Sequence, residues 1–455
     1  MVPHKTKSTT EFPLPNPTIS QYHIMWSLMQ LVPFYSLPLI LGAAFLFIKW
    51  YKSTPPTTFK KLPPSPPSLP LIGNIHQLKG TVHEAFESLS KRYGDPRGLV
   101  LVYIGTIPSL VVSTTEAARE IMKTHDLAFA DRPATRMFKA ISYNLKDGTI
   151  APYGEHWRQV KSILTLHLLC TKTVQTFEAM RRRVLAGYLT KINECFMSNK
   201  PVELTSMTSP DPVVAADGFT PLIEVLLKIQ KDDNLGITID SDVVKALLLD
   251  AYVAATDTTA SVIQWVMTEF LLNPEIMKKA KDEVNTILNG RKDITGEDLD
   301  KMTYLKAVIM ETTRLHPPVP ILLPRVARQD VNVMGYDIAE GTRVYVNVYA
   351  IMKDPKVWVN PEKFVPERFL DSSTDFIKHN FELLPFGAGR RACPGRIYSM
   401  AIDEMVLATF LYKYEWSLPQ GVKPEDVDME GTFGLANHKK VPLLAVAKPI
   451  TIDGK

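Results

Sequence analysis

The fold is decided by the ten residues Phe386-Gly387-Ala388-Gly389-Arg390-Arg391-Ala392-Cys393-Pro394-Gly395. Glycines let a backbone approach another group closely, and arginines offer bidentate contacts to anions. A helical pattern begins near Pro394 and extends to about Tyr412, so Cys393 stands at a helix N-terminus. The helix dipole and the nearby arginines would both favour the thiolate over the thiol. Cys393 is therefore expected to be an anionic ligand or a nucleophile.

Three other interpretations of this stretch are weaker. Residues 387–392 match a relaxed dinucleotide-binding fingerprint, but the surrounding chain lacks the alternating strands and helices of a parallel sheet. No histidine context favours a catalytic Cys–His pair. A buried structural cysteine would explain neither Arg391 nor the glycines. Cys170 and Cys195 lie within helical patterns and are expected to be packing residues.

The composition excludes several classes of protein. The chain has 455 residues, of which 45% are hydrophobic and 22% are charged, so it carries enough apolar surface to fold. Three cysteines are too few for a disulfide scaffold of this length. A formal net charge of +4, without a long basic run, gives no reason to expect nucleic-acid binding.

Helical patterns dominate the chain, and the strands are short. Helices are expected over residues 116–124, 157–169, 173–196, 242–272, 274–288 and 299–315, with Ser241 as the cap of the long fourth one. Strands are expected over residues 99–104, 109–113, 331–333 and 343–348. The sequence therefore predicts a mainly α protein with a minor β-sheet.

The N-terminal end predicts a membrane anchor. A polar extension, residues 1–24, precedes an apolar stretch, residues 25–48, that is long enough for a spanning helix. A basic and proline-rich hinge follows over residues 49–74, and its lysines predict a cytoplasmic body. A cleaved signal peptide is disfavoured because the run is too long, its charges lie on the wrong side and no small-residue cleavage site ends it. The apolar end of the hinge, residues 69–73, is expected to pack against the body.

Four motifs together resemble those of the cytochrome P-450 family. The pattern Phe386-x-x-Gly389-x-Arg391-x-Cys393-x-Gly395 resembles its haem-binding signature. Glu311-Thr312-Thr313-Arg314 and Pro366-Glu367-Arg368-Phe369 resemble its ion-pair helix and the segment whose arginine joins that pair, and residues 254–259 resemble its oxygen-binding groove. The resemblance covers nearly the whole chain, proline-rich hinge included, and is closest to the plant microsomal members.

The resemblance implies haem b as cofactor, with Cys393 as the axial thiolate ligand of its iron, which favours O–O cleavage. Asp257 and Thr258 would relay protons on the opposite face. Glu311, Arg314 and Arg368 would form a structural ion-pair triad. The haem-binding residues that the resemblance implies are Cys393, Arg391, Phe386, Gly389, Gly395, Arg325, Trp157 and Lys161.

The resemblance also implies partners and a location. Residues 75–455 would form one haem-binding catalytic body on the cytoplasmic side of the endoplasmic reticulum membrane. The body would oxidise a small apolar substrate with O2 and with electrons from NADPH, passed on by a separate NADPH–cytochrome reductase. The segments expected to line the substrate pocket are residues 136–143, 254–255, 319–322 and 433–435.

The sequence departs from the family pattern in three places. Lys161 stands where the motif normally ends in arginine, so a weaker clamp on the haem propionates is expected. Ala255 stands where glycine is usual. Family members carry several pocket-roofing helices where this chain has only residues 205–221, a short linker whose Pro, Ser and Thr content is expected to form no helix pair. An inactive truncated chain, or the product of a faulty gene model, therefore remains the alternative, with a dinucleotide-dependent oxidoreductase as a remote third.

Overall fold

A computed structural model of the chain describes residues 38, 40–45, 47, 61–204, 212–232, 239–370, 381–434 and 436–450. The chain divides into two compact units, residues 1–58 and 59–455. In the first unit the described residues are helical, and Ile40, Leu41 and Phe45 are exposed. The rest of the expected anchor, the polar extension before it and residues 49–60 of the hinge lie outside the described residues.

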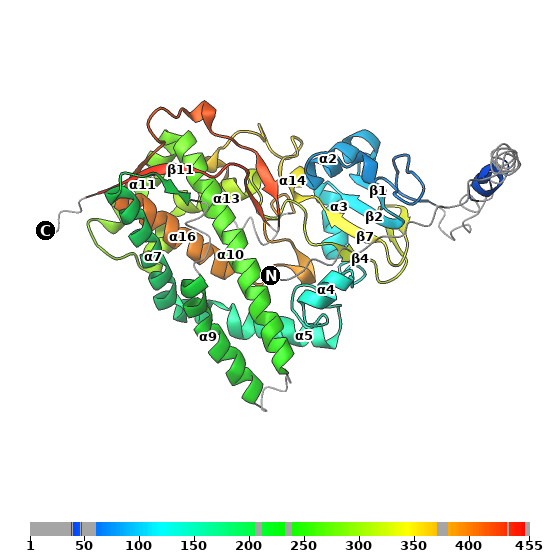
Figure 1. Ribbon diagram of the computed structural model, residues 1–455, viewed down its shortest axis with the longest axis horizontal. Helices are drawn as coiled ribbons and strands as arrows, with labels where there is room; N and C mark the ends of the chain where they lie inside the picture. The colour runs from blue at the N-terminus through cyan, green and yellow to red at the C-terminus, as the bar shows by residue number, and fades with distance from the viewer. Residues whose placement is uncertain are drawn as a thin grey trace, which may run out of the picture. The chain divides into compact units, whose positions relative to one another are not determined.

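Helices make up most of the second unit (Figure 1). The α-helices are α2 (Val82–Tyr93), α3 (Thr115–Arg119), α4 (Arg136–Ile141), α5 (Glu155–Ser162), α6 (Thr171–Thr176), α7 (Glu178–Met197), α9 (Pro212–Lys231), α10 (Ser241–Leu272), α11 (Pro274–Leu288), α12 (Gly296–Lys301), α13 (Thr303–Leu315), α14 (Val348–Met352) and α16 (Arg396–Lys413). The π-helical turns η2 (Glu120–Thr124) and η3 (Ile163–Leu168) continue α3 and α5, and the 3-10 turns are η1 (Ile75–Gln77), η5 (Pro366–Phe369), η6 (Gly389–Arg391) and η7 (Pro424–Asp426). The main apolar core lies among α7, α10, α11, α13 and α16.

The strands of the described residues form four small sheets. They are β1 (Leu99–Ile104), β2 (Ile107–Val112), β3 (Val202–Glu203), β4 (Arg325–Val326), β5 (Val331–Val333), β6 (Tyr336–Ile338), β7 (Arg343–Val346), β8 (Tyr414–Ser417), β9 (Gly431–Phe433), β10 (Asn437–Lys439) and β11 (Leu444–Pro449). The largest sheet has the order β1-β2-β7-β4, and only its β2–β7 pair is parallel. The others are β3-β11-β8, β5-β6 and β9-β10. The expected mainly α fold with a minor sheet is confirmed.

Helix α10 runs through the middle of the second unit (Figure 1). Its N-cap is Asp240, whose side chain accepts a hydrogen bond from the Val243 N–H at 2.9 Å, so the expectation of Ser241 as cap is off by one residue. Every residue from 259 to 271 is buried. Among the described helices α10 alone is long and apolar enough to cross a membrane, but burial in the core explains that composition.

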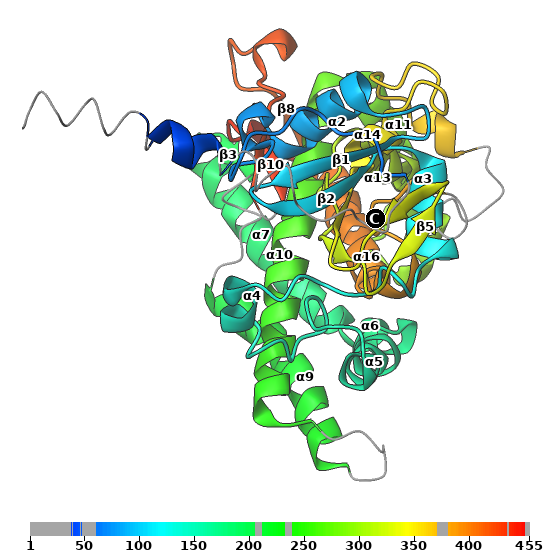
Figure 2. The same ribbon diagram turned by 90° about the vertical axis from the view of Figure 1, so that its right-hand side faces the viewer.

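Helix α9 includes part of the expected linker, residues 205–221. A short linker with no helix pair was expected there, and the described residues contain a single helix, α9, that begins at Pro212. Proline tolerates the first helical turn, where its missing N–H needs no partner. Leu222, Leu226 and Ile229 recur at helical spacing and are buried in the cluster shared with η3 and α10. Figure 2 shows α9 beside the N-terminal part of α10. Residues 205–211 lie outside the described residues.

The end of the hinge contacts the body through polar groups rather than apolar side chains. Leu69, Leu71 and Ile72 are exposed, so the expectation that residues 69–73 pack through their apolar side chains is wrong. Asn74 is buried instead, and its Oδ1 accepts the N–H of Tyr103 at 2.7 Å. The buried amide oxygen accepts a hydrogen bond from a backbone N–H of β1, which an aliphatic side chain could not do.

A buried carboxyl group on α16 predicts a pH-dependent stability. Asp403 is 1% exposed and its Oδ1 has no partner within the described residues; burial raises its pKa well above the ordinary value. The folded state therefore holds a proton that the unfolded state releases above about pH 4. Stability should fall by up to ~1.4 kcal/mol per pH unit from there until the folded pKa is reached. Asp403→Asn should reduce this slope in thermal unfolding between pH 4 and 8, whereas the exposed control Asp300→Asn should keep it.

Candidate functional site

The loop that leads into α16 is a tight turn around Cys393. The Cys393 N–H donates to the carbonyl oxygen of Phe386 at 2.9 Å. Gly387 and Gly389 adopt φ values of +63° and +72°, a region that favours glycine. A Cβ atom on Gly389 would lie 2.2 Å from the carbonyl oxygen of Met122, so the close packing of the loop on η2 also requires glycine.

The electrostatics at Cys393 differ from the sequence expectation. Burial raises the pKa of the Cys393 thiol, and the Gly395 N–H and the charges of Lys161 and Arg396 offset this only in part. The protein packed around the sulfur thus acts against the positive charges of Lys161 and Arg396. A bound metal cation deprotonates a coordinating thiol, so a ligand role is compatible with this pKa. The side chain keeps exposed surface through which a metal can be reached.

Two arginines beside the loop direct their guanidinium groups to backbone carbonyls. Arg391 Nε donates to the carbonyl oxygen of Ala130 at 2.7 Å, and its Nη2 donates to that of Ala151 at 2.5 Å. Arg132 Nη1 donates to the carbonyl oxygen of Pro324 at 3.0 Å. Arg391 Nη1 is buried and has no hydrogen-bond partner in the described part of the chain.

Arg325 and Lys161 complete a cationic cluster with these two arginines. Arg325 is 3% exposed, and its Nη2 donates to the carbonyl oxygen of Ala388 at 2.9 Å. Its Nη1 lies 3.4 Å from Oδ1 of Asp126. Lys161 Nζ donates to the carbonyl oxygen of Ala392 at 2.7 Å, so it bonds the residue directly before the cysteine.

Among the described residues, Asp126 beside Arg325 is the one carboxylate that pairs with any of the four cations of the cluster. Burial, followed by the charge of Arg325, lowers the pKa of Arg391 to about 10. Burial, Arg325 and Arg391 lower the pKa of Arg132 well below its usual range. Mutually repelling buried cations with an unsatisfied donor form an anion site, because an added anion would relieve both the repulsion and the unmet hydrogen bond. The carboxylates of a haem placed on Cys393 fit this requirement.

Trp157, one of the expected haem-binding residues, lies against Arg391 of the cationic cluster. Its Nε1–H already donates to the carbonyl oxygen of Gly148 at 2.9 Å, so the indole has no donor left for a propionate. The Arg391 guanidinium lies over the Trp157 ring at 4.3 Å from the centroid, and the ring therefore supports that cation. Sequence analysis missed Arg132, because no motif marks it and only tertiary structure brings it to the cluster.

The polar turn of α10 is held by contacts that the sequence did not predict. The Thr258 hydroxyl donates to the carbonyl oxygen of Ala254 at 2.6 Å, as mid-helix threonines commonly do. Asp257 Oδ1 lies 2.7 Å from Nε2 of His438 on β10. Asp257 and Thr258 are neighbours on the helix, but their side chains form these hydrogen bonds with different partners. His438 is a further residue that sequence reasoning missed.

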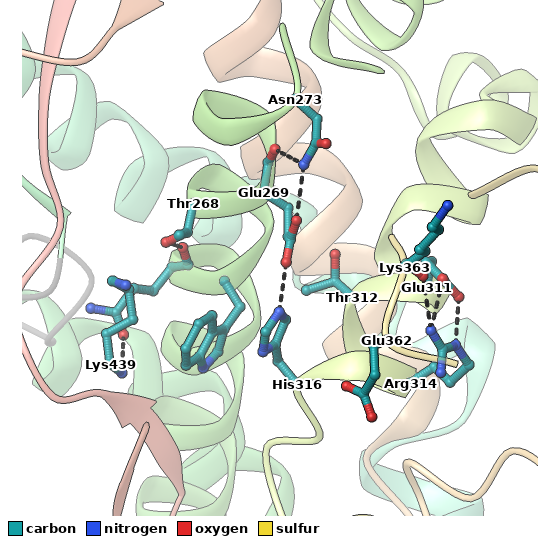
Figure 3. Close-up of polar contacts among 12 residues, drawn as sticks. Thr268, Glu269, Asn273, Glu311, Thr312, Arg314, His316, Glu362, Lys363 and Lys439 are labelled. Atoms are coloured by element: carbon teal, nitrogen blue, oxygen red, sulfur yellow. Dashed lines mark hydrogen bonds and ion pairs between the residues drawn. The ribbon is translucent and has the colours of Figure 1, made fainter. Parts of the chain in front are cut away.

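The structure brings the three expected triad residues together. Arg314 Nε and Nη2 donate to the two carboxylate oxygens of Glu311 at 2.7 and 2.9 Å, and both side chains are fully buried (Figure 3). Arg368 Nε donates to Glu311 Oε1 at 3.2 Å. Arg314 Nη1 also donates to the carbonyl oxygen of Met352 at 2.9 Å. The triad therefore joins α13 to η5 and α14.

The expected substrate side is rich in exposed apolar groups. Residues 136–141 form α4, where Met137 and Ile141 are 63% and 46% exposed. On α10, Leu249 and Tyr252 are 38% and 41% exposed. Helices α4 and α10 therefore keep part of the surface of these apolar side chains exposed. The side chain of Phe433 and all of Leu435 lie outside the described residues.

Restoring arginine at position 161 should strengthen haem retention. Lys161→Arg would place a planar guanidinium group, which can donate two parallel hydrogen bonds, where the Lys161 ammonium now donates to the Ala392 carbonyl. One additional charge-assisted hydrogen bond should slow haem transfer to apomyoglobin by about tenfold. Arg158→Lys, on the exposed face of the same helix, should leave the transfer rate unchanged. An unchanged rate in Lys161→Arg would contradict a propionate role for this position.

The comparisons with known proteins agree on one family. A family model described as Cytochrome P450 matches residues 63–210 and 216–445. Cytochrome P450 736A117 of Prunus mume is 39% identical, with 89% of this chain and 94% of the relative covered. Norfluorocurarine oxidase of a Strychnos species is 37% identical (90% and 96% covered), and tabersonine/lochnericine 19-hydroxylase of Catharanthus roseus is 36% identical (91% and 97%). A zebrafish cytochrome P450 solved with abiraterone has a TM-score of 0.70 at 23% identity, covering 81% of this chain and 100% of that chain.

The relatives contain residues that this chain lacks. The alignment with the Prunus mume relative extends over 488 positions, although this whole chain has only 455 residues. The family match is interrupted between residues 210 and 216, inside the stretch where the roof helices were expected to be missing.

Proposed function

Because this chain belongs to the cytochrome P450 family, we propose that it is a membrane-anchored monooxygenase that hydroxylates or oxidises a small apolar specialised metabolite. Haem is the cofactor of the family, and when bound it activates O2 for insertion of one oxygen atom. Relatives named as an oxidase of norfluorocurarine and a 19-hydroxylase of tabersonine and lochnericine support an oxidation of this class. The dinucleotide-dependent alternative is dropped, because residues 387–392 lie in a loop and a 3-10 turn and not after a parallel strand.

One observation carries the proposal: the buried cationic cluster next to Cys393. Three of its four cations have no carboxylate partner and Arg391 Nη1 is unpaired in the described structure, so the two carboxylates of a haem would offset the repulsion between these charges. Cys393 would be the protein ligand of the haem iron. Arg391, Arg325, Arg132 and Lys161 would hold the propionates and so fix the orientation of the ring.

The remaining residues would serve substrate and protons. The exposed apolar side chains of α4 and α10 would contact an apolar substrate, since they offer no polar group to orient a charged one. Asp257 and Thr258, on the α10 turn, would handle protons during oxygen activation. Electrons would come from NADPH through a separate NADPH–cytochrome reductase. Residues 25–48 would anchor the protein in the endoplasmic reticulum membrane, with the body in the cytoplasm.

The proposal is tested in two steps on the full chain. We expect the haem-loaded protein, reduced under carbon monoxide, to give the Soret band of a thiolate-ligated iron. We then expect substrate-dependent NADPH oxidation and a mono-oxygenated product when a plant reductase and a panel of apolar metabolites are added. A chain that takes up no haem would overturn the enzyme proposal outright.

A second candidate is a chain that binds haem weakly and has no turnover. It is favoured by the longer alignments of the relatives and by the apolar side chains left uncovered on α4 and α10. An open pocket admits water, which would waste the activated oxygen. Sequencing transcripts across residues 205–221 separates the two explanations, because a longer transcript would restore the roof. A haem-bound chain that oxidises NADPH without forming product would favour this second candidate.

A further inference from the structure

The β9–β10 hairpin is attached to α10 at the turn that carries Asp257. The Ser261 hydroxyl and the Trp265 Nε1–H both donate to the carbonyl oxygen of Asn437, at 2.7 and 2.8 Å. Asp257 bonds His438 at 2.7 Å. Asp257, Ser261 and Trp265 are four residues apart in turn, so they share one face of the helix. The hairpin is therefore fixed along this face at three successive turns.

The contact with Asp257 differs from the other two contacts, because it joins two ionisable side chains. His438 Nε2 carries the hydrogen, since the carboxylate opposite can only accept. Asp257 Oδ2 makes no hydrogen bond among the described residues. The exposed fractions of the His438 and Asp257 side chains are 24% and 36%, so the pair lies at the border between solvent and the interior.

The other cations of the hairpin are engaged elsewhere. Lys439 Nζ donates to the carbonyl oxygen of Asp428 and lies 5.0 Å from the centroid of the Trp265 ring. Lys440 Nζ pairs with Glu430 at 2.6 Å. Within the described chain His438 is thus the one cationic or donor side chain that contacts the Asp257 carboxylate.

We propose that His438 is a positioning residue for oxygen activation: its Nε2–H holds one oxygen of Asp257 and leaves the other free to transfer protons at the α10 turn. This inference rests on the proposed monooxygenase function. A single hydrogen bond to Oδ1 fixes the carboxylate rotamer, and an exposed aspartate without that bond would sample several. The hydrogen bond that attaches the hairpin to α10 at this turn therefore also fixes the orientation of the Asp257 carboxylate.

The stoichiometry of the reaction provides the readout. Insertion driven by NADPH consumes two protons: RH + O2 + 2e⁻ + 2H⁺ gives ROH + H2O. Insertion driven by hydrogen peroxide consumes none: RH + H2O2 gives ROH + H2O. Hydrogen peroxide brings both of its protons with it, so a defect in proton delivery from solvent slows the first reaction much more than the second. A general packing defect slows both equally.

The variants are His438→Leu, which removes the donor, and His438→Gln, whose amide N–H keeps it without a titrating ring. In His438→Leu we expect NADPH-driven product formation to fall about fivefold, the equivalent of one net hydrogen bond, with more peroxide released, while peroxide-driven turnover is retained. His438→Gln should recover most of the NADPH-driven rate. Lys440→Ala, two residues along the same hairpin, should match the parent in both assays.

Several outcomes would overturn the inference. Equal losses in both assays would show a packing role, and a glutamine variant as slow as the leucine variant would show that His438 acts by titrating. Parent-like rates in His438→Leu would show no role at all. If the parent protein binds no haem, the proposed function is wrong. The contact between His438 and Asp257 is then tested by a measurement that needs no turnover. His438→Leu and Asp257→Ala should each raise the unfolding constant of the protein, and the double variant should raise it about fivefold less than the product of the two single effects. Purely additive effects in thermal unfolding would refute the contact.

Discussion

Cys393→Ala is expected to abolish the thiolate-type Soret band of the carbon monoxide complex and all turnover. A methyl group cannot ligate iron, and no other cysteine lies in the described loop around position 393. The cationic cluster would persist in this variant, because its arginines bond to backbone carbonyls and not to the sulfur. Haem could then associate without a thiolate ligand, which gives a different spectrum or none. The measurement is the reduced difference spectrum per mole of purified protein.

The other two cysteines provide matched controls for this prediction. Cys170 stands at the start of α6, and Cys195 is half-buried on α7 against the main core. Cys170→Ala and Cys195→Ala should each keep the thiolate band. A thiolate band that survives in Cys393→Ala, or that disappears in Cys195→Ala while the protein stays folded, would show that residue 393 is not the thiolate ligand.

Glu311→Gln is expected to cost about 3–5 kcal/mol of folding free energy, the usual penalty for breaking a buried ion pair. Arg314 is fully buried and bonds both carboxylate oxygens, so the neutral amide would leave its charge uncompensated. The remaining amide oxygen can still accept from Arg368 and the Val365 N–H, but the new NH2 group would face the Nε–H of Arg314, a donor facing a donor. The chain segment that leads from α13 to the loop at Cys393 should then unfold at a lower denaturant concentration. Urea unfolding followed by circular dichroism gives the free energy.

Two comparisons make the prediction for Glu311 specific. Lys278→Ala breaks the exposed Lys278–Asp282 pair and should leave stability unchanged. The double variant Glu311→Leu with Arg314→Leu removes both buried charges and should be less destabilised than Glu311→Gln alone. A Glu311→Gln protein as stable as the parent would mean that the triad does not secure this part of the fold.

Local patterns in the sequence predicted much of the fold. Helix α11 occupies residues 274–288 and strand β5 residues 331–333, both as expected, because hydrophobic spacing and Pro274 mark their bounds locally. Motifs far apart in the sequence also meet as expected, since Glu311 and Arg368 are hydrogen-bonded. Such contacts were predictable only through the family resemblance.

What the sequence could not predict depends on tertiary surroundings. Arg132 and His438 reach their sites from a loop and a hairpin whose positions no local pattern determines. The raised pKa of Cys393 reflects the amount of protein packed around it, which spacing between residues does not show. The hydrogen bond from the Trp157 N–H to a backbone carbonyl nine residues earlier is likewise set by the loop that carries Gly148 and by no local pattern.

The pairing of β3 with the final strand has a consequence for how this chain tolerates changes in length. β3 ends at Glu203 and is hydrogen-bonded to β11, while α9 is secured by its own apolar side chains against α10 and η3. The two ends of the segment between Glu203 and α9 are therefore fixed by contacts with other elements. Lengthening a connection between fixed ends costs only ~0.6 kcal/mol per doubling. This junction is a natural position for grafting, where segments of very different size can be exchanged without disturbing the frame on either side.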